Sequence, residues 1–226
     1  MGEIVDFPSN GGTASGYLAT PESGTGIPLV VIQEWWGLVP HITDVADRFA
    51  AEGFVALVPD LYHGETTTEP DEAGKLMMAM NLGQAGKDMS GAVEKVAEVS
   101  GRDAVGVTGF CMGGGLALIL AAQRPDRVKA VVPWYGLLPW PDSQPDWARL
   151  EASVLGHYAA NDEYFTPELA RELEQTLKAL GKDATINVFP GVEHAFFNDT
   201  RPEVYDAEAA ADAFRQTVDF LREKLS

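Results

Sequence analysis

The chain has 226 residues but a single cysteine, Cys111, and only four histidines. One cysteine cannot form an intramolecular disulfide framework and cannot supply a cysteine-based zinc cluster. Positive charge is also scarce, because 16 lysines and arginines stand against 34 acidic residues, which gives a formal net charge of −18. An excess of negative charge disfavours partners that present phosphate groups. We therefore expect no nucleic-acid partner and no binding to an anionic membrane.

Long apolar runs are missing as well. No stretch approaches the roughly 18 apolar residues that a membrane-spanning helix needs, and the first twenty residues lack the basic and apolar regions of a signal peptide. We expect a cytoplasmic protein, either a monomer or a small homo-oligomer. With 46% hydrophobic residues, the chain is too apolar for intrinsic disorder. Its length fits one domain that spans residues 1–226.

Short β-branched segments alternate with helical segments along the chain. Two alternating segments around a Ser-Asn-Gly-Gly turn predict an N-terminal hairpin, Glu3–Phe7 and Ala14–Ala19. Buried strands are predicted at Ile27–Ile32, Phe54–Val58, Ala104–Gly109, Val128–Trp134, Ala152–Tyr158 and Ala184–Phe189. Helices are predicted at His41–Glu52, Gly83–Val99, Met112–Gln123, Thr166–Leu180 and Val204–Leu225. In the fourth of these helices, Thr166 is the expected N-cap, Pro167 the first helical residue and Gly181 the residue that ends the helix. This order predicts an α/β fold: a mostly parallel, doubly wound sheet with helices on both faces and an antiparallel N-terminal hairpin.

The segment Gly-Phe-Cys-Met-Gly, residues 109–113, lies where a predicted strand turns into a predicted helix. It matches the nucleophile elbow G-x-S-x-G, with cysteine in place of serine. An isolated cysteine is most often a small buried hydrophobe. Here the glycines make room for a strained turn, and the start of a helix favours a thiolate. We interpret Cys111 as a nucleophile and the Met112 N–H as an oxyanion donor.

An elbow nucleophile needs a base and an acid, which follow it in the order acid, then base. His194 follows the last predicted strand and is the candidate base. His157 lies inside an apolar strand, which favours a packed histidine. His41 and His63 lie upstream of the elbow, and we expect both to be solvated or packed against a loop. Asp162 follows the preceding strand and would orient the base, although Glu163 is its immediate neighbour. The predicted triad is Cys111, Asp162 and His194, and it requires no cofactor and no metal.

These motifs resemble the dienelactone hydrolase family of α/β-hydrolases. The resemblance rests on Gly-Phe-Cys-Met-Gly-Gly-Gly, the Asp162 loop and Val-Glu-His-Ala-Phe-Phe, together with Gln-Glu-Trp-Trp-Gly at residues 33–37, and it covers nearly the whole chain. It implies an α/β-hydrolase fold and hydrolysis of small esters or lactones through a thioester. It also implies that Glu34 holds the resting thiol and that the Trp35 N–H is a second oxyanion donor.

The sequence departs from this family at the clamp for the substrate carboxylate. Members that cleave dienelactone use two arginines, one of them four residues after the catalytic histidine. That position is Asn198 here, and no arginine occurs between Arg48 and Arg102. We therefore expect a neutral or short-chain ester or lactone. Two alternatives remain: a true dienelactone hydrolase (carboxymethylenebutenolidase) with an altered clamp, and a non-catalytic protein that senses a ligand or redox state through Cys111.

The substrate pocket is less well defined by the sequence. Aromatic residues near the motifs are candidates for its walls, and equally for the core. The predicted substrate-binding residues are Trp36, Tyr135, Phe196 and Asn198. The segments Pro59–Gly74 and Leu137–Trp147 are predicted to be surface loops that cover the site.

Overall fold

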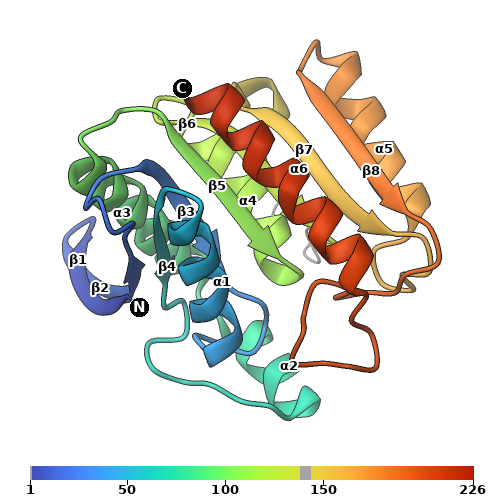
Figure 1. The fold of residues 1–226 in the computed structure, drawn as a ribbon, viewed down its shortest axis with the longest axis horizontal. Coiled ribbons are helices and arrows are strands. Elements are labelled where there is room, and N and C mark those ends of the chain that lie inside the picture. Colours follow the sequence, from blue (N-terminus) through green and yellow to red (C-terminus); the bar gives the residue numbers. More distant parts are fainter. Residues whose placement is uncertain (1, 138–143) are drawn as a thin grey trace. The chain divides into compact units, whose positions relative to one another are not determined.

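Strands and helices alternate along the residues that the computed structural model describes, 2–137 and 144–226 (Figure 1). Contacts between residues divide the chain into two compact units, residues 1–107 and 108–226. The segment Leu137–Trp147, predicted to cover the site, lies largely outside the described residues. None of the helices in the described part combines the length and the hydrophobicity that a membrane span requires.

The first unit contains strands in the order β1-β2-β4-β3. Their bounds are β1 Glu3–Ser9, β2 Gly12–Ala19, β3 Ile27–Ile32 and β4 Phe54–Pro59. The predicted hairpin is confirmed, because β1 and β2 pair antiparallel around Asn10 and Gly11, which both have positive φ, as hairpin turns require. Strands β3 and β4 pair in parallel. Both consist almost entirely of buried residues, as their unbroken apolar sequences predict.

Three helices accompany these strands: α1 Pro40–Ala51, α2 Pro70–Ala79 and α3 Leu82–Ser100. Figure 1 shows α1 and α3 on opposite faces of the strands of this unit. The prediction of one long surface loop over Pro59–Gly74 is wrong in two respects. Helix α2 begins at Pro70, and Asp60, Leu61 and Tyr62 are buried. Because Ala73 is the one buried residue of α2, its sequence carries no apolar periodicity.

The second unit begins within β5 (Val105–Phe110) and has the strand order β5-β6-β7-β8. The other strands are β6 Val128–Trp134, β7 Ser153–Ala159 and β8 Ala184–Phe189, and the pairs β6–β7 and β7–β8 are parallel. Its helices are α4 Met112–Gln123, α5 Pro167–Ala179 and α6 Ala207–Leu225. Figure 1 shows α4 and α6 on opposite faces of these strands. The predicted α/β class is confirmed.

Helix ends follow the expected capping chemistry. The Thr166 hydroxyl accepts from the Leu169 N–H before Pro167, and Gly181 after α5 has a φ of +72°, as predicted. Helix α6 begins at Ala207 rather than at Val204, because the Asp206 carboxylate accepts from the Ala209 N–H and starts the helix there.

In the second unit, three polar segments follow parallel strands. Cys111 follows β5, Asp162 follows β7, and His194 follows β8. Parallel strands place their carboxyl ends at one edge, where α/β folds bind ligands. The topology therefore brings these three residues to the same edge of the unit.

Candidate active site

Cys111 lies between the last residue of β5 and the first residue of α4. Its backbone has φ +54° and ψ −120°, a conformation that residues other than glycine rarely adopt. Two backbone hydrogen bonds hold the turn: the Cys111 N–H donates to the Trp134 carbonyl at 3.0 Å, and the Gly114 N–H donates to the Cys111 carbonyl at 2.9 Å. This geometry is that of a strand–turn–helix elbow.

The elbow has no room for side chains at two neighbouring positions. A Cβ at Gly109 would overlap the Gly113 carbonyl, and a Cβ at Gly136 would overlap the Cys111 carbonyl oxygen. Gly109 belongs to the motif and was expected to be tightly packed. Sequence reasoning missed Gly136, which follows β6, because its contact with the elbow is not local in sequence. The one sequence feature that could have pointed to Gly136 is its position directly after a predicted strand, at the end of the segment Trp-Tyr-Gly.

His194 and Asp162 form a direct pair. The His194 Nδ1 lies 2.7 Å from the Asp162 Oδ2. The other carboxylate oxygen, Oδ1, accepts from the backbone N–H groups of Tyr164 and Phe165 at 2.8 and 2.9 Å. Since these three donors hold Asp162 in place and its side chain is buried, it holds the imidazole in one orientation. The neighbouring Glu163 is exposed.

The pair strongly favours a charged histidine. Burial alone would lower the pKa of His194, but its side-chain hydrogen bonds to Asp162 and Cys111, and their negative charges, raise the pKa from 6.5 to about 10. For Asp162, burial would raise the pKa, but the His194 hydrogen bond and charge and the two backbone N–H groups lower it overall. The hydrogen bonds to Asp162 and Cys111 therefore favour the imidazolium form of His194.

Aromatic rings surround the His194 imidazole. The ring centroids of Tyr135, Tyr164 and Phe165 lie 5.2, 5.7 and 5.8 Å from it. Tyr135 is fully buried, whereas Tyr164 is 76% exposed. The predicted wall residue Phe196 is buried, with its ring 5.5 Å from that of Tyr135. Tyr164 and Phe165 were not singled out as site residues from the sequence, although both follow Asp162 directly.

Backbone strain is concentrated in this unit around the three residues. Five non-glycine residues of the described chain have positive φ, and three of them are Cys111, Tyr135 and Ala195. Tyr135 lies beside His194, and Ala195 is the residue after it. Strained backbone persists where the surrounding structure overdetermines it, and it clusters at active sites.

The remaining second-unit candidates are buried. Asn198 accepts from the Thr200 backbone N–H at 3.1 Å and from the Thr200 hydroxyl at 2.6 Å through the same Oδ1. His157 is packed as expected, with its Nε2 3.0 Å from the Thr217 hydroxyl, and burial lowers its pKa to about 3. The described residues contain no group of three or more His, Cys, Asp or Glu side chains that could hold a metal ion.

Glu34, Trp35 and Trp36 belong to the first unit. The turn that carries them follows β3, and the Glu34 side chain is buried. The rings of Trp35 and Trp36 meet edge to face with centroids 5.1 Å apart. Their predicted roles beside Cys111 stay predictions. His41, expected to be solvated or packed against a loop, is buried on α1.

Three kinds of comparison point in one direction. The model of the dienelactone hydrolase family matches residues 14–225. "Protein usf" of Aquifex pyrophilus is 38% identical, and the match covers 100% of each chain. A protein of Aquifex aeolicus named "Putative carboxymethylenebutenolidase" is 36% identical over 98% of each chain. A Klebsiella pneumoniae crystal structure titled "Putative Dienelactone Hydrolase" is 30% identical, with a TM-score of 0.87 over 99% of this chain and 98% of that chain.

The crowding at the elbow predicts a large effect of Gly136→Ala. The added Cβ overlaps the Cys111 carbonyl oxygen, so we expect the free energy of unfolding to fall by about 3 kcal/mol or more, measured by urea denaturation. Gly74→Ala on α2 is the matched control, because its Cβ would meet nothing within 4 Å and alanine favours a helix. Equal stability of the two variants would contradict the close packing described for the elbow.

The His194–Asp162 pair predicts a high histidine pKa that depends on one carboxylate. We expect His194 to titrate at about pH 10 by NMR, and its pKa to fall in Asp162→Asn. Glu163→Gln, which removes the adjacent exposed carboxylate, should leave the pKa unchanged. Because folding raises this pKa above 6.5, the pair stabilises the fold fully below pH 6.5, and this contribution is lost as pH rises to about 10. Equal shifts in both variants would contradict the assignment of Asp162.

Proposed function

The chain belongs to the dienelactone hydrolase family, and we propose that it hydrolyses small neutral carboxylic esters or lactones through Cys111, His194 and Asp162. The observation that carries the proposal is the arrangement of the second unit. A strained elbow presents Cys111, His194 is hydrogen-bonded to it, and Asp162 is buried behind that histidine and hydrogen-bonded to its Nδ1. A cysteine that only fills the core would need neither partner.

In the first half of the reaction, the Cys111 sulfur attacks the carbonyl carbon of the ester. The tetrahedral intermediate then breaks its bond to the alcohol oxygen, and His194 gives that oxygen a proton. The products are an alcohol and a thioester on Cys111. Since Nδ1 of His194 is held by Asp162, Nε2 is the nitrogen left to transfer the proton.

In the second half, His194 accepts a proton from water, and the resulting hydroxide attacks the thioester carbonyl. The carbon–sulfur bond breaks, the acid is released, and Cys111 returns as the thiolate beside the imidazolium. A thiolate leaves a tetrahedral intermediate more readily than an amine does. This chemistry favours esters and lactones over amides as substrates.

The negative charge of each tetrahedral intermediate needs hydrogen-bond donors. The Met112 N–H at the start of α4 is one candidate, and the Trp35 N–H is the second, which comes from the family resemblance. The family resemblance likewise implies that Glu34 would hold the resting thiol. Aromatic side chains around His194, including Tyr135, would line the apolar part of the pocket.

The charge of the protein sets the preferred class of substrate. Asn198 stands where carboxylate-binding relatives have an arginine, and its side-chain oxygen is taken up by Thr200. A net charge of −18 lowers the local concentration of anions at the surface. Both features support a neutral substrate rather than dienelactone, which carries a carboxylate.

The test is a panel of neutral esters and lactones, each paired with the same compound bearing a carboxylate. We expect kcat/KM to be higher for the neutral member by about tenfold or more, with a smaller difference in high salt. Cys111→Ala and Cys111→Ser should lower kcat by about a thousandfold or more while the protein stays folded.

Three results would contradict the proposal. Full activity of Cys111→Ala would exclude the cysteine mechanism. A wild-type protein that hydrolyses no member of the panel would instead favour a binding or redox-sensing role for Cys111. A preference for the carboxylate-bearing member would support a true dienelactone hydrolase with a rearranged clamp.

A further inference from the structure

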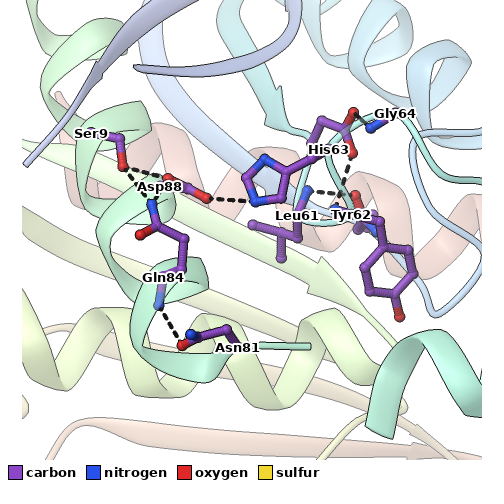
Figure 2. Close-up of polar contacts among 10 residues, drawn as sticks. Ser9, Leu61, Tyr62, His63, Gly64, Asn81, Gln84 and Asp88 are labelled. Carbon is purple, nitrogen blue, oxygen red and sulfur yellow. Dashed lines mark hydrogen bonds and ion pairs between the residues drawn. The ribbon is translucent and has the colours of Figure 1, made fainter. Parts of the chain in front are cut away.

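Asp88 on α3 is a buried carboxylate that the proposed reaction does not use. Its side chain is 1% exposed. Its Oδ1 accepts from the Ser9 hydroxyl at the end of β1 and from the Gln84 amide at 2.8 Å (Figure 2). Its Oδ2 accepts no hydrogen bond within the described chain and faces the His63 Nε2 at 3.5 Å. The carboxylate thus connects β1, α3 and the loop after β4.

Burial of a carboxylate is costly unless the carboxylate is paired or hydrogen-bonded. Polar contacts to a buried carboxylate are weak sources of stability, and their best-attested use is to select one arrangement of the chain. The arrangement selected here includes His63, whose φ of +53° is uncommon for a residue other than glycine. The His63 side chain is also 55% exposed, so apolar packing does not hold it in place.

The loop of residues 60–67 is ordered around His63. The Asp60 carboxylate accepts from the Tyr62 N–H at 3.1 Å and from the Gly64 N–H at 2.6 Å. These bonds close a tight turn on either side of His63, as Figure 2 shows. Because His63 belongs to this ordered turn, the contact between its ring and Asp88 restrains the loop backbone as well as the His63 side chain.

The same loop braces the turn of residues 33–37. The Leu61 N–H donates to the Gln33 Oε1 at 3.2 Å, and the Thr67 N–H donates to the Trp36 carbonyl at 3.0 Å. Between them, the backbone of Gly37 comes so close to the loop that a Cβ would lie 2.5 Å from a loop carbonyl oxygen. The turn is thus held by the loop at several points along its length.

We propose that Asp88 is a positioning residue, which through His63 holds the 60–67 loop against the 33–37 turn that carries Glu34 and Trp35. The proposal rests on the proposed function, in which the Trp35 N–H stabilises the oxyanion. An oxyanion donor acts in the transition state, so its displacement lowers kcat and leaves KM nearly unchanged. Misplacement by about 1 Å can cost up to about a hundredfold in rate.

The test separates the two sides of the Asp88 carboxylate. His63→Asn replaces the imidazole with a shorter side chain that no longer reaches Asp88. Asparagine tolerates a positive φ, so the backbone of the loop can be kept. Asp88→Asn removes the charge that faces His63 but keeps the volume. Ser9→Ala is the matched control, because it removes the bond from Asp88 to β1 and leaves the loop side intact.

We expect His63→Asn and Asp88→Asn each to lower kcat about tenfold with KM within about twofold of wild type. The double variant should lose no more than either single variant, because both break one contact. The Leu61 and Thr67 amides, followed by hydrogen exchange, should exchange faster in these variants. Ser9→Ala should change neither kcat nor these exchange rates.

Several outcomes would overturn the positioning role. One is a His63→Asn variant with wild-type kcat and exchange. Another is a Ser9→Ala variant that matches Asp88→Asn, which would make Asp88 a purely structural link. Faster exchange with unchanged kcat would also overturn it. If the wild-type protein hydrolyses no ester, the proposed function fails, and the exchange rates still decide whether Asp88 holds the loop and the turn.

Discussion

The absence of side-chain volume around Cys111 is the constraint on which the site depends. The residue occupies a backbone conformation with φ +54°, and the carbonyls of the elbow leave no space for a Cβ at Gly109 or Gly136. Bonds from β6 and α4 close the turn around it. The packing and hydrogen bonds of the surrounding unit offset the energy of this strained backbone. The sulfur is therefore presented at the start of a helix rather than buried in the core. In the proposed mechanism, His194 and Asp162 act on a nucleophile whose position is already fixed.

Electrostatics around the elbow are local and oppose the overall charge of the chain. In the proposed reaction, a protein with a net charge of −18 has to stabilise negative charge on a sulfur and on an oxyanion. The groups proposed for this are His194, whose pKa is raised to about 10 by its hydrogen bonds to Asp162 and Cys111 and by their charges, and backbone N–H groups. Distant acidic side chains are screened by solvent and salt, but they still disfavour an anionic substrate on its approach.

Much of this could be predicted from the sequence because its causes are local. The G-x-C-x-G motif, the Thr166 cap and the Asn10-Gly11 turn each act within a few residues of their own position. Helix α2 was missed because it is mostly exposed and has no apolar face to detect. Gly136 and the His63–Asp88 pair could not be recognised, because each depends on a contact between elements that are distant in sequence. Asp162 and His194 could be proposed from the sequence because the strand order of the fold places the acid before the base along the chain.

The reaction path is tested most directly by intact-protein mass spectrometry on a quenched reaction. His194→Gln removes the residue proposed as the base that activates water in the second half of the reaction. Mixed with an activated neutral ester, this variant should accumulate one acyl group, located on Cys111 and released by hydroxylamine. Cys111→Ser/His194→Gln should show no hydroxylamine-labile thioester. An ester hydrolysed by the wild-type protein with no acyl group ever detected on Cys111 would contradict the account.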